Sequence, residues 1–286
     1  MLSSDRRRIL VPPSAHALQY VDSPAISISA TDDAHKIYLQ PHILSDANGS
    51  AYFEHQQTKV LVLVSGPKPQ RSSFSSSAKL VVEVKFLPVS SSSHTLGLQQ
   101  GQGYTTTLER TLADYVYASL VPSIRLIQYP KSAINVSVVV LSGPPAWTDI
   151  LKQIAAACVT TASVAVVDSG IEVIDLVSAC AMRFGTDGET NSFAEFDVDE
   201  NAKALPTGGR AVVSYMAARD EITGFWVDEE NYPGDTKSVN ISLQGEYAIN
   251  ILRTACDGAK EVRKFVNGVL LQTVEDAMQM KYSEES

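Results

Sequence analysis

The sequence has few of the residues on which disulfide-bonded or metal-binding proteins depend. Only three of its 286 residues are cysteines, Cys158, Cys180 and Cys256. Their odd number and wide spacing fit neither a disulfide framework nor a zinc site, and they indicate buried thiols in a reducing compartment. The five histidines show no metal-ligand spacing. Gly101-Gln102-Gly103 lies too close to the next predicted helix for a dinucleotide-binding turn. From these three observations we expect neither a bound metal nor a cofactor.

Long apolar runs and excess positive charge are also missing. No uninterrupted apolar run approaches the roughly 18 residues of a membrane span. The basic cluster Arg6-Arg7-Arg8 is followed by only Ile9-Leu10-Val11 before two prolines, which does not predict a signal peptide. The net charge is −9, whereas a chain that holds nucleic acid alone is normally basic because phosphate contacts dominate that affinity. We therefore expect no membrane contact, and we expect any RNA to be held jointly with other chains.

The most informative stretch runs from Trp147 to Val177. It passes through small and β-branched residues to Asp168, and its alanines leave little side chain on the helix surface, so that another backbone can pack close. Gly170 can take the φ > 0 conformation that closes a helix. The apolar residues 171–177 then predict a short strand. This pattern is typical of the core helix of an α/β layer.

The rest of the chain alternates between strand and helix patterns. Thr58 to Ser65 is a continuous apolar run of strand length, which predicts burial on both faces of a sheet. The order of elements predicts a mixed α+β fold in which mixed sheets pack against long helices. The expected strands cover residues 37–44, 51–55, 58–65, 78–89, 134–141, 211–217, 222–227 and 238–243, and the expected helices cover 105–121, 147–168 and 247–280.

Length and composition allow one large α/β unit. We interpret residues 1–36, which are rich in Pro, Ser and Asp, as an irregular N-terminal arm. Residues 37–286 are then a single domain. Two low-complexity insertions, near 90–103 and 185–209, interrupt it.

Several sequence landmarks, taken in order, resemble the RNase PH-like ring subunits of the eukaryotic RNA exosome. The resemblance covers nearly the whole chain, and its specificity lies in the ordered set rather than in any single motif. It implies the RNase PH-like fold, which is related to domain 2 of ribosomal protein S5. The landmarks are Asp5-Arg6-Arg7-Arg8, Asn48-Gly49-Ser50-Ala51, Thr58-Lys59-Val60 leading to Gly66-Pro67, Tyr129-Pro130-Lys131-Ser132-Ala133-Ile134, Ala162 to Ile171, and Gly224-Phe225-Trp226.

The resemblance implies where a phosphate site would lie. Active members of the superfamily degrade RNA from its 3′ end by phosphorolysis, and a Gly-Ser/Thr-Arg loop near the start of the central helix holds the attacking phosphate. Counting back from Asp168 without gaps places that loop on Gln153, Ile154 and Ala155. Because neither the glycine nor the arginine is present, we expect no phosphate binding there.

RNA-gripping arginines are the second element of active relatives. Alignment on Glu109 places Thr105 and Thr106 at those positions, and a hydroxyl carries no charge. Arg110 lies nearby, where a solvated helix residue is the simpler interpretation. Arg125 and Lys131, near the Tyr-Pro-Lys-Ser turn, are candidate RNA contacts in a pore, with surface solvation as the alternative.

The third element is a pair of carboxylates six residues apart. A gapless alignment places Tyr232 and Ser238 there, and neither can act as an acid or as a metal ligand. A shift of three residues offers Glu229 and Asp235 instead. That shift defines the alternative hypothesis of an active phosphate-dependent 3′-exoribonuclease, although carboxylates without a phosphate site have no nucleophile to work with.

The resemblance therefore implies a non-catalytic structural subunit of the exosome ring, which supports RNA processing and degradation. Its implied partners are other RNase PH-like ring subunits, an S1-domain cap protein, RNA in the central channel and, indirectly, a hydrolytic nuclease. The implied location is the nucleus and nucleolus, and also the cytoplasm. The acidic net charge fits this interpretation better than a stand-alone RNA-binding module.

Overall fold

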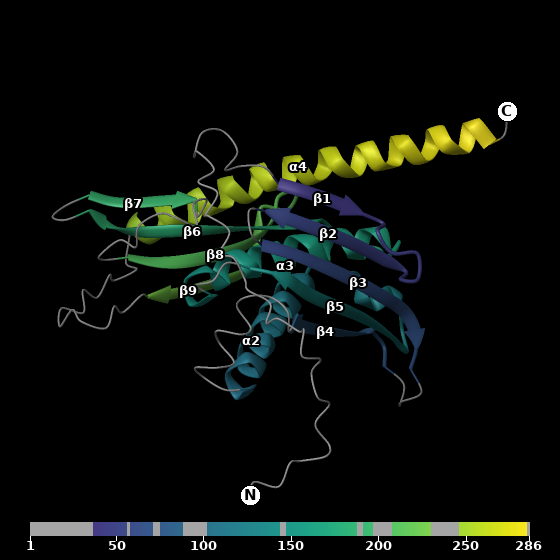
Figure 1. Ribbon diagram of the computed structural model, residues 1–286, viewed down its shortest axis with the longest axis horizontal. Helices are drawn as coiled ribbons and strands as arrows, with labels where there is room; N and C mark the ends of the chain where they lie inside the picture. Colours follow the sequence, from purple (N-terminus) through teal and green to yellow (C-terminus); the bar gives the residue numbers. More distant parts are fainter. Residues whose placement is uncertain are drawn as a thin grey trace, which may run out of the picture. The chain divides into compact units, whose positions relative to one another are not determined.

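A computed structural model gives the fold of residues 37–55, 58–70, 75–87, 102–143, 147–187, 191–196, 208–229 and 246–284 (Figure 1). These residues belong to the unit Ala34–Ser286 and include three α-helices and nine strands. The helices are α2 (Gln102–Leu120), α3 (Trp147–Asp168) and α4 (Glu246–Glu284). The strands are β1 (Ile37–Pro41), β2 (Gly49–His55), β3 (Thr58–Pro69), β4 (Lys79–Phe86), β5 (Ser132–Ser142), β6 (Val177–Asp187), β7 (Asn191–Phe196), β8 (Gly208–Met216) and β9 (Glu221–Glu229).

The strands form two sheets. The first has the order β1-β2-β3-β5-β4, with antiparallel neighbours except for the parallel pair β4 and β5. Helix α2 connects that parallel pair, as a crossover connection requires. The second sheet has the order β7-β6-β8-β9 and is antiparallel throughout. The predicted mixed fold of sheets and long helices is confirmed.

Helix α3 lies between the two sheets. It contacts β1, β2, β3 and β5 of the first sheet and β6 and β8 of the second. Every residue from Leu151 to Val166 is buried. Helix α4 packs on β6, β7, β8 and β1, while α2 contacts β4, β9 and α3. The hydrophobic core is therefore built around α3.

The small residues of α3 allow very close backbone contacts. An added Cβ at Gly49, where β2 begins, would lie 2.3 Å from the Ala165 carbonyl oxygen and 2.4 Å from the Ser169 nitrogen. Beside this contact, the Ser50 N–H donates to Asp168 Oδ2 at 2.8 Å. Gly170 closes the helix with a φ of 73°, as predicted. The β2 start and the end of α3 thus fit together through backbone rather than side chains.

Hydroxyls of α3 also satisfy the backbone of β6. The Val177 N–H donates to Ser163 Oγ at 2.9 Å, and the Ala179 N–H donates to Thr160 Oγ1 at 3.1 Å. Strand β7 pairs with β6 only from Met182 onward. The α3 hydroxyls therefore occupy the place of a neighbouring strand, and buried N–H groups that would otherwise lack acceptors are satisfied.

A buried ion pair joins α4 to the loop after α3. Arg263 Nη2 lies 2.5 Å from Asp175 Oδ1, and Arg263 Nη1 donates to the Leu176 carbonyl at 2.7 Å. The other Asp175 oxygen accepts the Ala218 N–H at 2.9 Å. The Asp175 side chain is 3% exposed. Burial alone would raise the pKa of Asp175, but the hydrogen bonds from Arg263 and Ala218 together lower it.

The structure differs from the sequence expectations at three places. Strand β3 is fully buried on one face only, because its alternate residues are partly exposed, so predicted burial on both faces is wrong. A strand was predicted over residues 171–177, but residues 171–176 form an irregular segment with one bridge, and strand β6 begins at Val177. Within the predicted insertion 185–209, residues 191–196 form β7. The predicted strand 238–243, the arm 1–36 and most of 90–103 lie outside the described residues.

One helix has the composition of a membrane span. Residues Leu151–Asp168 have a mean hydropathy of 1.3, but 89% of this window is buried inside the protein. Contact with both sheets accounts for its apolar character, since a core helix passes the same test.

We predict that Gly49→Ala destabilises the protein by roughly 1–3 kcal/mol or more, because the added methyl group meets backbone atoms that cannot rotate away. Urea denaturation measures the change. Gly268→Ala on α4 is the matched control, since a Cβ there meets nothing within 4 Å and replacing a helical glycine stabilises by about 0.5–1 kcal/mol. Equal effects of the two substitutions would contradict the close contact.

We predict that Arg263→Met lowers the free energy of unfolding by roughly 3–5 kcal/mol, because it leaves the buried Asp175 carboxylate without its cation. Arg219→Met is the control: it removes the exposed pair with Glu221 and costs at most about 1 kcal/mol. The same denaturation experiment measures both.

The pH dependence follows from the same pair. The folded-state pKa of Asp175 lies below its unfolded value of about 3.9, so the stabilisation is complete above that value and is lost as the pH falls through the folded pKa. Arg263→Met should flatten this acid limb of the stability curve. If Arg263→Met leaves the acid limb of the stability curve unchanged, the ion pair with Arg263 does not lower the pKa of Asp175.

Candidate functional site

The predicted phosphate positions lie inside α3. Only the first four N–H groups of a helix lack a hydrogen-bond acceptor within the helix. Helix α3 begins at Trp147, so Gln153, Ile154 and Ala155 lie beyond these four positions. Ile154 and Ala155 are 0% exposed and face the core. Gln153 Nε2 lies 3.3 Å from His55 Nδ1 on β2. The structure thus places these three residues in core packing, with neither free N–H groups nor positive charge.

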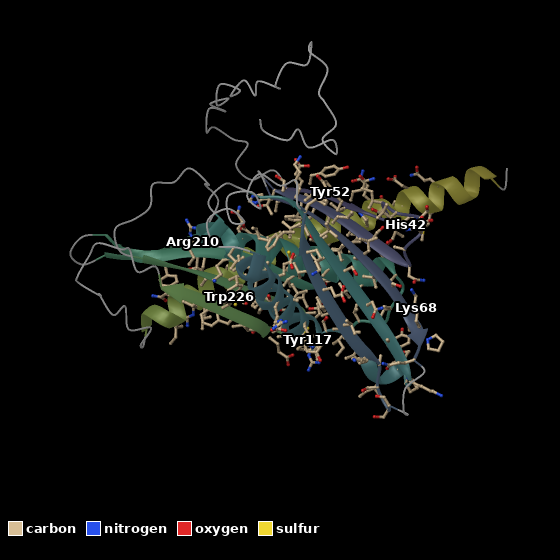
Figure 2. The ribbon with its side chains drawn as sticks, turned by 60° about the horizontal axis from the view of Figure 1, so that its bottom comes forward. His42, Tyr52, Lys68, Tyr117, Arg210 and Trp226 are labelled. Atoms are coloured by element: carbon tan, nitrogen blue, oxygen red, sulfur yellow. The ribbon has the colours of Figure 1, made fainter. Side chains whose placement is uncertain are left out.

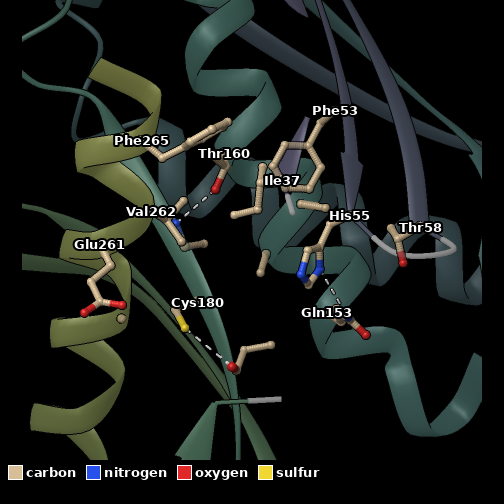
Figure 3. Close-up of a pocket in the computed structure, with 15 residues that line it drawn as sticks. Ile37, Phe53, His55, Thr58, Gln153, Thr160, Cys180, Glu261, Val262 and Phe265 are labelled. Carbon is tan, nitrogen blue, oxygen red and sulfur yellow. Dashed lines mark hydrogen bonds between the residues drawn. The ribbon is translucent and has the colours of Figure 1, made fainter. Parts of the chain in front are cut away.

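Gln153 and His55 border a pocket of about 360 Å³ between α3, α4, β6 and the β1–β3 end of the first sheet (Figure 3). Most of its lining is apolar, including Phe53, Val262 and Phe265. Neither lysine nor arginine is among the described residues that line it. A phosphate dianion would therefore find no positive charge in this pocket.

A buried lysine lies next to Gln153, and the sequence alone gave no sign of its environment. Lys152 is 2% exposed, and its Nζ lies 3.3 Å from the centre of the Trp226 ring on β9. The Tyr115 ring of α2 lies 5.7 Å from the same tryptophan. This contact couples the start of α3 to β9 through a cation–π interaction. Trp226 belongs to the Gly-Phe-Trp landmark and is labelled in Figure 2.

Hydroxyl groups continue this contact toward the second sheet. The Tyr115 hydroxyl lies 2.8 Å from Ser214 Oγ, and Ser119 Oγ donates to the same atom at 3.1 Å. Burial raises the pKa of Tyr115 to about 12. The phenol therefore stays protonated at neutral pH and serves as a structural hydrogen-bond group.

The predicted RNA-gripping positions lie within a helix rather than before it. Helix α2 begins at Gln102, so Thr105 and Thr106 are part of it, and their side chains lie outside the described residues. Arg110 is exposed on the same helix.

The alternative carboxylates are only partly placed. Glu229 is the last residue of β9 and pairs with Gly209, while its side chain is not described. Asp235, Tyr232 and Ser238 lie outside the described residues. The pairing of Glu229 with Asp235 therefore lies outside the described residues and stays a prediction.

Arg125 and Lys131 lie at one end of the first sheet. Arg125 Nη1 is 3.0 Å from Glu172 Oε1, and both side chains are about half-exposed. Lys131 is exposed with a φ of 56°, and its backbone N–H donates to Ser75 at 3.0 Å. Lys68 of β3 and Lys79 of β4 both lie opposite Ala133 of β5, one on each side of that strand. Lys68 is labelled in Figure 2. We call Lys68, Lys79 and Lys131 the lysine cluster; no carboxylate of the described residues lies within ion-pair distance of them.

Metal and thiol chemistry find little support in the described residues. No three His, Cys, Asp or Glu side chains gather there to hold a metal ion. Complete burial raises the pKa of the Cys158 thiol to about 12, and burial also raises that of Cys256. Neither thiol is therefore a nucleophile at neutral pH.

Comparison with known proteins shows extended sequence similarity. Residues 33–172 match the profile of the 3′ exoribonuclease family, domain 1 (RNase PH). The exosome complex component mtr3 of Schizosaccharomyces pombe is 33% identical over 274 residues, which cover 94% of this chain and 96% of that protein. MTR3 of Chaetomium thermophilum is 27% identical, over 85% of this chain and 91% of that protein. Human MTR3 is 28% identical, over 63% of this chain and 68% of that protein.

Solved structures share the fold. Rice Rrp46 superposes with a TM-score of 0.59 at 17% identity, covering 82% of this chain and 94% of that one. A chain of the Archaeoglobus fulgidus exosome with RNA bound to the active site superposes with a TM-score of 0.54 at 14% identity, covering 80% of this chain and 87% of that one. Fold and sequence agree, and the chain belongs to the Mtr3 family of RNase PH-like exosome components.

Proposed function

We propose that this chain is a non-catalytic structural subunit of the RNA exosome ring. The observation that carries the proposal is the similarity to S. pombe mtr3, an exosome complex component, along 94% of the chain. Such similarity along almost the full length favours the same place in an assembly, because subunit contacts are distributed over a whole fold. The acidic net charge of −9 fits a member that shares RNA with more basic neighbours.

The environment of α3 supports the absence of phosphorolysis in this chain. Gln153, Ile154 and Ala155 are buried in the helix, and the cation beside them, Lys152, contacts Trp226. Phosphorolysis needs a bound phosphate as nucleophile, and these described residues offer it neither a free N–H cradle nor a free guanidinium. Phosphate-dependent cleavage with Glu229 and Asp235 is therefore the weaker alternative.

The proposed partners are other RNase PH-like ring chains and RNA that passes through the ring. We extend the proposal to an S1-domain cap protein and, indirectly, a hydrolytic nuclease, and to a location in the nucleus, nucleolus and cytoplasm. The family resemblance supports these finer assignments. RNA contact would fall on Arg125 and Lys131, because they lie at one end of the first sheet, and Lys131 belongs to the lysine cluster.

We predict that the tagged chain, purified from its own cells, is found by native mass spectrometry in a stoichiometric assembly with other RNase PH-like chains. After removal of the hydrolytic nuclease, this assembly should release no nucleoside diphosphates from RNA when phosphate is added. An active RNase PH enzyme serves as the positive control. Phosphate-dependent release that disappears with Glu229→Gln would establish the enzymatic alternative, and recovery as a monomer would contradict the ring assignment.

We predict that Lys131→Ala lowers the salt dependence of single-stranded RNA binding by the assembled ring. One lost phosphate contact reduces the slope of log K against log salt by about 0.7. Filter binding over a range of salt concentrations measures this slope. Lys264→Ala, which removes an exposed lysine of α4, should leave it unchanged. Identical slopes for both variants and the wild type would remove Lys131 from the RNA path.

A further inference from the structure

The pocket between α3, α4, β6 and the first sheet has two chemically different ends. Figure 3 shows Val262 and Phe265 of α4 on one side of it, where the lining is apolar. On the other side lie His55, Thr58 and Gln153, which come from β2, β3 and α3. Apolar walls with a few polar groups at one end are typical of a site for a small molecule.

The polar end holds a buried hydroxyl group without a hydrogen-bond partner. Thr58, the first residue of β3, is 0% exposed and lies opposite His55 in the strand pairing. Its Oγ1 forms no hydrogen bond with any of the described residues. Buried polar groups in folded proteins are normally satisfied by a protein atom or by an ordered molecule, because an unpaired one is destabilising. The Thr58 hydroxyl therefore offers a hydrogen bond to a molecule in the pocket that it borders.

The amide of Gln153 supplies a second polar group at the same end. Its Nε2 lies 3.3 Å from His55 Nδ1, and Figure 3 shows the amide oxygen turned away from the histidine. The described residues donate no hydrogen bond to that oxygen. An amide oxygen only accepts, whereas a hydroxyl both donates and accepts. A ligand with a hydroxyl group matches both residues, since it can donate to Gln153 and accept from Thr58.

The charges of the lining favour an uncharged ligand. The described residues that line the pocket include neither lysine nor arginine, so an anion would lose its water without gaining a positive partner. Glu261 of α4 also borders the pocket, and its negative charge opposes an anion further. Because Glu261 is exposed to solvent, its attraction for a cation is weak.

The size of the pocket sets the size of the ligand. Its volume is about 360 Å³. This value lies within the range of about 300–1,000 Å³ that is usual for small-molecule sites. An engineered apolar cavity of about 150 Å³ in another protein binds benzene. The pocket therefore has room for a body of about two fused rings and a polar substituent.

We propose that this pocket binds a small uncharged molecule with an apolar ring system and a hydroxyl group. The rings lie against Phe53, Val262 and Phe265, and the hydroxyl lies at the end formed by Thr58 and Gln153. The inference goes beyond the proposed function and does not depend on it, because every lining residue belongs to this chain.

Three related probes test the chemistry of the site on the isolated full chain. The probes are 2-naphthol, naphthalene, which lacks the hydroxyl, and 2-naphthoate, which carries a negative charge. In ligand-detected NMR titrations we expect 2-naphthol to bind about fivefold more tightly than naphthalene, the effect of one hydrogen bond. We expect 2-naphthoate to bind at least about tenfold more weakly than 2-naphthol, because its charge finds no cation.

Thr58→Val tests the polar end, because valine keeps the shape of threonine and lacks the hydroxyl. We expect the affinity for 2-naphthol to fall about fivefold and the affinity for naphthalene to stay unchanged. The urea midpoint of the free protein should rise, since the unpaired hydroxyl is gone. Thr223→Val on β9 is the matched control: the Thr223 hydroxyl also lacks a partner among the described residues, but Thr223 does not line the pocket. It should raise the midpoint and leave 2-naphthol binding unchanged.

Ala156→Leu tests the location of the site, because a larger side chain on α3 occupies part of the pocket. We expect it to weaken binding of both 2-naphthol and naphthalene by about tenfold or more. Ala118→Leu makes the same change at an exposed position of α2, outside the pocket, and should leave binding unchanged. Circular dichroism checks that both variants fold.

Three results would overturn the proposal. The first is that 2-naphthol does not bind up to its solubility limit, in which case the pocket holds water alone. The second is that 2-naphthoate binds as tightly as 2-naphthol. The third is that Thr58→Val leaves the preference for 2-naphthol over naphthalene unchanged.

Discussion

The contact of α3 with both sheets is the constraint on which the rest of the structure depends. Gly49 approaches the Ala165 carbonyl so closely that no side chain fits between β2 and the helix. On the opposite side, Ser163 and Thr160 accept N–H groups of β6. A helix of large side chains could not stand this close to two sheets, and a helix of alanines alone would leave the β6 backbone unsatisfied.

This constraint also bears on chemistry. Helix α3 uses Gln153 to Ala155 for packing, and Lys152 holds β9 through Trp226. Burial of Gln153 to Ala155 leaves no N–H group or positive charge at these positions to hold a dianion, so core packing takes the residues to which the resemblance assigns phosphate binding. The proposed non-catalytic role is consistent with this use of the site: the fold is retained for the surfaces it presents.

Sequence reasoning recovered α3, its glycine stop and the strands β8 and β9, because periodicity and turn residues are local signals. It failed at residues 171–177, where apolar composition predicts a strand but the chain turns toward β6 instead. It also failed on β3, since a run of apolar residues does not reveal whether the chain or a partner covers the second face. The contact of Lys152 with Trp226 joins residues far apart in sequence, and no local pattern predicts it.

The most direct test of this account is a cryo-electron microscopy structure of the assembly purified through this chain. We expect a ring of RNase PH-like chains in which this subunit has no phosphate beside Gln153. A structure with phosphate or the 3′ end of RNA bound beside Glu229 would contradict the non-catalytic role. Purification of the chain without RNase PH-like neighbours would contradict its place in the ring.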